Sequence, residues 1–162
     1  MIETGAQRPS AVHHAGFTVR SFDHIVALLV DLFAAKLEFR GSPADPTIVA
    51  RITGIADARA QIAMLDLGSC RIELLQYGRP SNRCHEVLRP CDSGHAHIAF
   101  ECNAIDEIVH AARRYGFELS APVATVETGP NKGRRAAYLH DEQGFVLELL
   151  ARPIQSLTLL VD

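Results

Sequence analysis

Apolar and polar residues alternate along residues 94–102, and this period of two predicts a β-strand with one buried face. One face of the strand is apolar, whereas the other carries His95, His97 and Glu101. Buried imidazoles and carboxylates are costly unless they are paired or bind a metal ion. A single histidine in a strand is more often structural than a ligand. This strand alone therefore does not indicate a metal site, and the rest of the chain must be compared with it.

A second strand of this kind is predicted at residues 12–20, where His14 lies on the face opposite to Phe17 and Val19. By the same alternation, His13 faces away from His14 and is expected to be structural. Each of these strands precedes a segment with apolar residues at helical spacing, and each helix precedes further strands. The expected helices span residues 22–37 and 103–115, and the expected later strands span 38–41, 60–67 and 70–77 in the first half and 123–127, 134–140 and 145–151 in the second. Residues 47–58 fit neither pattern clearly.

Both halves of the chain therefore follow one βαβββ plan and close on Glu-Leu-Leu. His14 and His97 are 83 residues apart (97 − 14), and Glu73 and Glu148 are 75 residues apart (148 − 73), as in a duplicated unit. Apolar residues flank each glutamate and are expected to face the helices, so both glutamates face the other side of the sheet. The pattern predicts an α+β fold in which four strands present two imidazoles and two carboxylates to one concave surface.

These four side chains form a set that suits a divalent metal ion. Two unpaired carboxylates on one surface repel each other and take up protons, whereas a divalent ion removes the repulsion and uses all four groups as ligands. The expected ligands are His14, Glu73, His97 and Glu148. Mixed nitrogen and oxygen ligation suits Ni²⁺, Co²⁺, Zn²⁺, Mn²⁺ and Fe²⁺ alike, so the donor set does not select one of them.

Length and charge narrow the class of protein. A chain of 162 residues with a net charge of −3 fits one domain and carries no basic footprint for nucleic acid. Its apolar runs are too short to span a bilayer, and its first residues do not form a signal peptide. Four cysteines without CxxC spacing indicate no disulfide framework, so a cytoplasmic protein is expected.

The segments HHAGFTV at His14, RIELLQY at Glu73, HIAFEC at His97 and DEQGFVLELL at Glu148 resemble those of the vicinal oxygen chelate superfamily. This superfamily includes glyoxalase I, methylmalonyl-CoA epimerase and the extradiol dioxygenases. The resemblance covers residues 12–153 and implies two βαβββ modules that form a U-shaped mixed β-sheet, with helices on its outer face, around one divalent ion. The modules are expected at residues 12–78 and 94–152, with a linker at 79–93 and a tail at 153–162 that docks on a neighbouring surface.

The resemblance also implies a type of reaction. A small-molecule substrate with a carbonyl group beside a C–H bond chelates the metal, and Glu73 or Glu148 removes the proton, as in an isomerase, an epimerase or a glyoxalase-type lyase. The extradiol dioxygenases bind iron without the first of the two glutamates. A glutamate at position 73 therefore favours proton transfer over oxygen activation.

Five further residues are candidates for contact with the substrate. His95 and Glu101 share a strand face with His97, and they either contact substrate, orient a ligand imidazole or lie at an exposed strand end. The loop TGPNKGRR and the strand after it carry basic and phenolic groups that suit an acidic substrate, although a solvated turn is an equally good interpretation. The candidates are His95, Glu101, Lys132, Arg134 and Tyr138.

Two other functions remain open for this sequence. One is an Fe²⁺ extradiol-type dioxygenase, and the other is a drug-binding protein of the bleomycin-resistance type, which binds its ligand in the cleft of a dimer and usually lacks the metal ligands. A homodimer is expected, and the metal site either lies within one chain or is shared between two.

Overall fold

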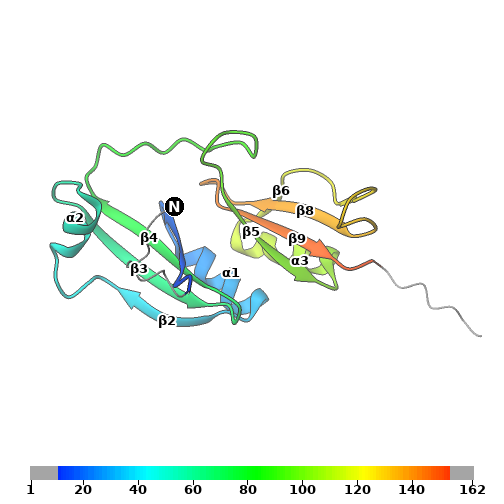
Figure 1. Cartoon of the computed structure of the whole chain (residues 1–162), viewed down its shortest axis with the longest axis horizontal. Coiled ribbons are helices and arrows are strands. Elements are labelled where there is room, and N and C mark those ends of the chain that lie inside the picture. The colour runs from blue at the N-terminus through cyan, green and yellow to red at the C-terminus, as the bar shows by residue number, and fades with distance from the viewer. Residues whose placement is uncertain (1–10, 154–162) are drawn as a thin grey trace, which may run out of the picture. The chain divides into compact units, whose positions relative to one another are not determined.

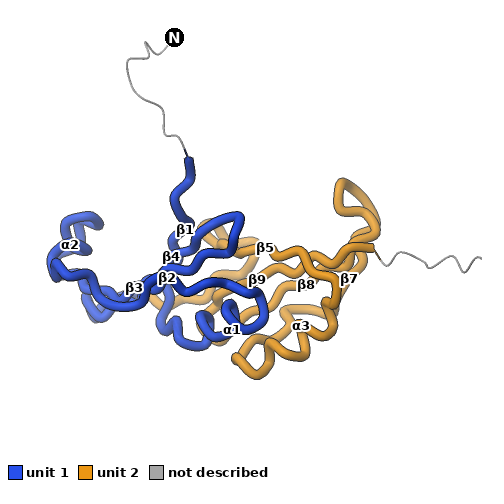
Figure 2. Tube along the Cα trace, turned by 90° about the horizontal axis from the view of Figure 1, so that it is seen from below, with its two compact units in different colours: residues 1–83 blue, residues 84–162 orange. Residues whose placement is uncertain are grey.

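The computed structural model describes residues 11–153, and within it the chain folds as two compact units that divide between residues 83 and 84 (Figure 2). We refer to them as unit 1 and unit 2. Each unit has its own mixed sheet and its own helices, so the expected α+β fold built from two related modules is confirmed (Figure 1). None of the helices in the described part of the chain combines the length and apolar character that a membrane span needs.

Unit 1 contains a four-stranded sheet in the order β1-β4-β3-β2. The first strand pairs in parallel with the last, and the other pairs are antiparallel. Burial alternates along the last strand, as expected when one face of a sheet packs on the core. Ile72 and Leu74 are buried, while Glu73 between them is only half-buried. The elements are β1 Ala15–Val19, α1 Asp23–Phe33, β2 Lys36–Gly41, α2 Ile48–Thr53, β3 Arg59–Asp66 and β4 Arg71–Arg79.

Unit 2 repeats this arrangement in the sheet order β5-β9-β8-β6, with β7 also paired to β8. Its first strand again pairs in parallel with its last. Leu147 and Leu149 are fully buried on one face of the last strand, whereas Glu148 is half-buried on the other. The elements are β5 His97–Cys102, α3 Ile105–Ala112, the 3₁₀ helix η1 Arg113–Tyr115, β6 Glu118–Leu119, β7 Ala124–Thr125, β8 Arg135–His140 and β9 Val146–Ala151.

Helices supply the second layer of each core. In α1, Ile25, Leu28 and Leu29 are fully buried, as expected for the apolar stripe of an amphipathic helix. In unit 2, α3 buries Ile105 and Val109 and lies against β9. The apolar face of each sheet is thereby covered, and the face that carries the histidines and glutamates is the opposite one.

Local details differ from the expectations or add to them. The strands expected at residues 12–20 and 94–102 span only Ala15–Val19 and His97–Cys102, so His95 precedes β5. The helix expected over residues 22–37 ends at Phe33, because Ala34 takes a left-handed conformation (φ 53°) and the chain turns into β2 at Lys36. The ambiguous residues 47–58 contain the short helix α2. The very short strand β6 is not predicted from the sequence, since two residues are too few to show alternation. The expected docking of the C-terminal tail concerns residues 154–162, which lie outside the described residues.

A tight contact in unit 2 gives a test of packing. Gly144 has φ +84°, and a Cβ atom on it would lie 2.7 Å from Cγ1 of Val87. We expect Gly144→Ala to lower the free energy of unfolding by about 2 kcal/mol or more, because a left-handed alanine alone costs about 1–2 kcal/mol. Urea unfolding measures this effect.

Gly68→Ala is the matched control, since Gly68 has a similar φ of +82° and nothing within 4 Å of the added Cβ. The control should show the backbone cost without the clash. Equal losses in the two variants would show that Val87 moves aside freely.

Candidate metal centre

Unit 1 brings one predicted histidine and one predicted glutamate together. His14 immediately precedes β1, and Glu73 lies in β4, where its strand partner is Gly16. Nε2 of His14 lies 3.4 Å from Oε2 of Glu73, and the two side chains are 33% and 19% exposed. The pair is therefore sheltered by the fold but reachable from solvent.

Unit 2 brings the other two together in the same way. His97 begins β5, Glu148 lies in β9, and the strand partner of Glu148 is Ala99. Nε2 of His97 lies 3.1 Å from Oε2 of Glu148, with exposed fractions of 36% and 22%. In both units the histidine stands two residues before the strand partner of the glutamate, so the same register produces both pairs.

The geometry of each pair suits two ligands of one cation. A neutral imidazole nitrogen and a carboxylate oxygen that face each other both carry lone pairs, so either a proton or a cation must lie between them. Two ligands bound to one ion by bonds of about 2.1 Å lie about 3.0 to 3.4 Å apart at octahedral or tetrahedral angles. The distances of 3.1 and 3.4 Å are within this range. Among the described residues, no group of three or more potential ligands forms.

The two pairs have different neighbours in their sheets. Tyr138 is the β8 partner of Glu148, and its ring centroid lies 5.1 Å from that of His97. Burial, and next the negative charge of Glu148, raise the pKa of the Tyr138 phenol, which therefore stays protonated. In unit 1 the partner of Glu73 on β3 is Met64, which offers no hydrogen-bond donor.

His13 lies elsewhere than the sequence predicts. Its Nδ1 is 2.7 Å from Nδ1 of His14, with the two rings nearly perpendicular. The prediction that His13 faces away is wrong, because β1 begins only at Ala15 and the alternation of a strand does not extend to the residues before it. The adjacent histidines in the sequence are the available signal for this contact.

Two of the predicted substrate residues bind each other. Arg134 donates a hydrogen bond of 2.6 Å to Glu101, and Arg152 lies 3.5 Å from the same carboxylate. The hydrogen bond from Arg134, followed by its positive charge, lowers the pKa of Glu101. In the neighbouring turn, the backbone N–H of Lys132 donates to the carbonyl of Gly129.

His95 lies close to the ligand pair of unit 2. Its ring centroid is 6.2 Å from that of His97. Its Nε2 is shielded from solvent and has no hydrogen-bond partner among the described residues. A shielded nitrogen without a partner is costly, so His95 is suited to accept or donate a hydrogen bond when a ligand is present.

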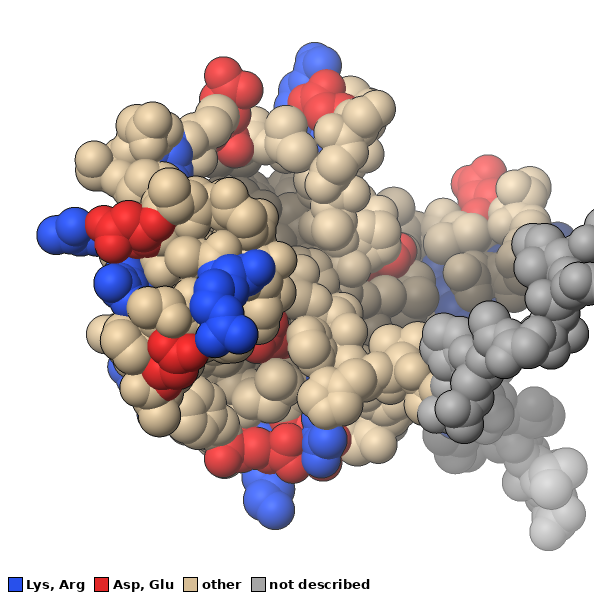
Figure 3. Space-filling model, turned by 60° about the vertical axis from the view of Figure 1, so that its left-hand side comes forward, with Lys and Arg blue, Asp and Glu red and all other residues tan. Residues whose placement is uncertain are grey.

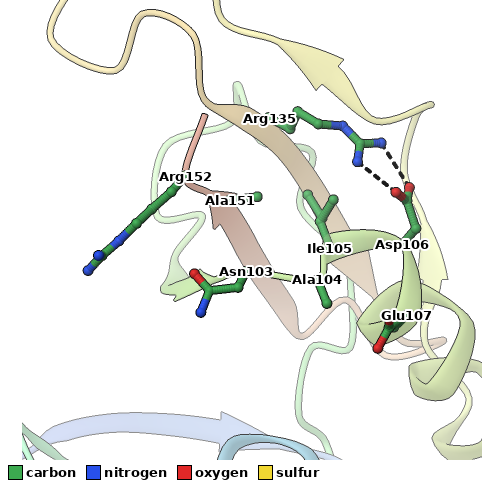
Figure 4. A pocket seen from close by; sticks show the side chains of 8 residues that line it. All are labelled: Asn103, Ala104, Ile105, Asp106, Glu107, Arg135, Ala151 and Arg152. Carbon is green, nitrogen blue, oxygen red and sulfur yellow. Dashed lines mark hydrogen bonds and ion pairs between the residues drawn. The ribbon is translucent and has the colours of Figure 1, made fainter. Parts of the chain in front are cut away.

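A separate pocket of about 210 Å³ opens at the start of α3 (Figure 4). The guanidinium of Arg135 binds both carboxylate oxygens of Asp106 at 2.6 and 2.8 Å, and the Arg152 side chain extends away from this pair. None of the four expected metal ligands lines the pocket. Its lining residues are Asn103, Ala104, Ile105, Asp106, Glu107, Arg135, Ala151 and Arg152.

Charged side chains elsewhere are largely neutralised by neighbours. Around α2, Arg51 pairs with Asp45 at 3.2 Å and Arg79 pairs with Asp57 at 2.8 Å. Figure 3 turns the side of unit 1 that contains α2 towards the viewer and shows basic and acidic side chains interspersed over the face drawn. That face therefore lacks the one-signed surface that attracts a polyanion.

Comparison with known proteins identifies the family. A model described as the Glyoxalase/Bleomycin resistance protein/Dioxygenase superfamily matches residues 13–138. No curated protein sequence gives a significant match. Among solved structures, a glyoxalase family protein from Bacillus cereus has a TM-score of 0.77 at 22% identity, covering 92% of this chain and 98% of its own.

Two further structures share the fold. A glutamate-to-glutamine mutant of FosX, a fosfomycin resistance protein from Listeria monocytogenes, was solved with Mn(II) and 1S,2S-dihydroxypropylphosphonic acid. It has a TM-score of 0.57 at 17% identity, over 91% of this chain and 94% of its own. A glutamate-to-glutamine mutant of glyoxalase I from Zea mays has a TM-score of 0.61 at 16% identity, over 87% of this chain and 45% of its own. On the family match and this fold, the chain belongs to the glyoxalase/bleomycin resistance protein/dioxygenase superfamily.

Proposed function

We propose that this protein is a metal-dependent enzyme that moves a proton next to a metal-chelated carbonyl group, as an isomerase, an epimerase or a glyoxalase-type lyase. The observation that carries the proposal is the repeated His–Glu pair, which has one register and one geometry in both units. Family membership supports it, since glyoxalases are part of the family description. The same description includes resistance proteins and dioxygenases, so we infer the type of reaction from the His–Glu pairs and not from the family match.

The ligands proposed for one divalent ion are His14, Glu73, His97 and Glu148. When bound, the ion supplies positive charge that stabilises the negative charge developing on the carbonyl oxygen of the substrate. Ni²⁺, Co²⁺, Zn²⁺, Mn²⁺ and Fe²⁺ all accept this mixture of nitrogen and oxygen donors. The FosX structure with Mn(II) shows that a protein of this fold binds such an ion.

The glutamates are also the proposed proton carriers. A carboxylate takes a proton efficiently when it lies within hydrogen-bond reach of the C–H bond and is held in place. Glu73 and Glu148 are both half-buried, and the strands β4 and β9 hold them in place. Two carboxylates supplied by different modules suit removal of the proton at one position and its return at another.

The remaining candidates are assigned to the substrate. Tyr138 stays protonated beside Glu148 and can donate its O–H to a substrate oxygen. His95 offers the shielded Nε2 described above. Lys132 and Arg134 offer positive charge to an acidic group, which would compete with Glu101 for the guanidinium. A small acidic carbonyl compound is the substrate class that this set favours.

Metal content tests the proposal directly. Protein purified without added ions should contain about one divalent ion per chain by elemental analysis. We expect His97→Ala to weaken the binding of Zn²⁺ by more than about 100-fold, because even contacts outside the ligand set change metal affinity by 10–100-fold. His110→Ala on α3 is the matched control and should bind like the wild type.

A protein that binds no ion and keeps the same stability in chelator would contradict the proposal. That result would favour the drug-binding function of the bleomycin-resistance type.

Exchange of the proton beside the carbonyl with solvent deuterium tests the reaction. Proton NMR should show this exchange for small 2-oxo acids or related carbonyl compounds. Glu73→Gln and Glu148→Gln should each slow it by about 100-fold or more, because general base catalysis contributes roughly that much.

Glu73→Ala separates this reaction from oxygen activation. If that variant keeps full activity, and the wild type consumes oxygen while cleaving a catechol, the protein is an Fe²⁺ extradiol-type dioxygenase instead.

The Glu101–Arg134 pair gives a pH-dependent prediction. The pKa of Glu101 is lower in the folded protein than in the unfolded chain, so the pair stabilises the fold above the unfolded pKa and loses this effect as the pH falls through the folded pKa. Arg134→Ala should raise the pKa of Glu101 towards its ordinary value, as measured by carbon NMR of the side-chain carboxylate. Its stability loss should be present near neutral pH and absent in acid.

Arg152→Ala is the control, because that guanidinium is 3.5 Å away and contributes less. An equal rise in the pKa of Glu101 in both variants would show that Arg134 is not the principal partner.

A further inference from the structure

Two neighbouring imidazoles meet beside the ligand pair of unit 1. Nδ1 of His13 lies 2.7 Å from Nδ1 of His14, and the rings are inclined by 80°. The residue that corresponds to His13 in unit 2 is Ala96, at the same offset of 83 residues (96 − 13). The contact therefore belongs to one ligand pair and has no equivalent in the other.

The distance between these nitrogens constrains the position of a proton. A neutral imidazole carries hydrogen on one nitrogen and a lone pair on the other. At 2.7 Å one of the two Nδ1 atoms must donate and the other must accept. The direction of this hydrogen bond decides which nitrogen of His14 is free, because the two nitrogens of one ring have opposite roles.

Only one direction suits a metal ligand. If His14 donates from Nδ1, its Nε2 has a lone pair directed to the side of Glu73, whose Oε2 is 3.4 Å away. If His14 accepts at Nδ1, its Nε2 carries hydrogen, and this hydrogen occupies the space between the two ligands. A cation and a proton cannot both lie there.

We propose that His13 is a positioning residue that accepts the Nδ1 hydrogen of His14 and thereby keeps Nε2 of His14 as the metal-binding nitrogen. The inference rests on the proposed function, since it assigns His14 to the metal. His13 itself is exposed and is not one of the proposed ligands. A hydrogen-bond acceptor behind a ligand histidine fixes its tautomer and orientation and also makes its free nitrogen a better donor to the metal.

The asymmetry of the two units follows from this contact. His14 forms a hydrogen bond with His13, whereas His97 lies against the ring of Tyr138. Loss of His13 should therefore weaken the ligand supplied by unit 1 and leave His97 unaffected.

The test uses the full chain and four variants, with Zn²⁺ as the probe. His13→Ala removes the acceptor, His13→Asn keeps an acceptor in the form of an amide oxygen, and His110→Ala is the control. Nitrogen-15 NMR of the Zn²⁺-loaded protein reports which nitrogen of His14 carries hydrogen, with His14→Gln used to assign its signals. Zn²⁺ affinity is measured in chelator-buffered titrations, and unfolding midpoints confirm that the variants are folded.

In the Zn²⁺-loaded wild type we expect His14 to carry hydrogen on Nδ1, with Nε2 free for the ion. In His13→Ala the Zn²⁺ affinity should fall about 10–100-fold, because Nδ1 of His14 loses its acceptor. His13→Asn should recover most of the affinity, and His110→Ala should leave it unchanged. A structural role alone would not be rescued by asparagine.

Two results would overturn the inference. The first is hydrogen on Nε2 of His14 in the Zn²⁺-loaded wild type, and the second is a Zn²⁺ affinity in His13→Ala equal to that of the wild type. Failure of the proposed function looks different, because the wild type itself would then bind no Zn²⁺.

Discussion

The parallel pairing of the first and last strands of each unit is the constraint on which the rest depends. Parallel partners point to the same side of a sheet, so the β1–β4 and β5–β9 ladders fix which residues share a face. The apolar neighbours of Glu73 and Glu148 are buried under the helices. Because successive side chains of a strand point to opposite faces, each glutamate lies on the other face of its sheet. Burial of the core thus holds each carboxylate beside its histidine.

Register also explains why the two pairs have one geometry but different chemistry. The backbone repeats from unit to unit, whereas the cross-strand neighbours do not. Glu148 has the protonated Tyr138 beside it, and Glu73 has Met64. The phenol of Tyr138 can donate a hydrogen bond to a carboxylate or to a substrate oxygen, whereas the thioether of Met64 has no hydrogen to donate, so the two glutamates are not interchangeable.

Much of this arrangement could be predicted from the sequence, because period-two alternation reports directly on strand faces. Apolar residues on both sides of Glu73 and of Glu148 predicted the face of each glutamate, whereas the parallel pairing of these strands with the histidine segments was not predicted. The end of α1 could not be predicted, since it depends on a left-handed alanine at position 34, a residue type that otherwise favours helix. The position of His13 could not be predicted either, because alternation holds only inside a paired strand, and residues before Ala15 have no ladder to orient them.

The equality of the two registers bears on how such a protein arises. One module presents one imidazole and one carboxylate, so two identical copies related by a twofold axis already contain all the donors of the proposed centre. While the copies are separate molecules, every substitution beside one donor pair appears beside the other as well. Once a single gene encodes both, each half changes independently. Tyr138 is found only beside the pair of unit 2, and His13 only beside the pair of unit 1. A symmetric dimer of identical chains could not have had either residue beside one pair alone.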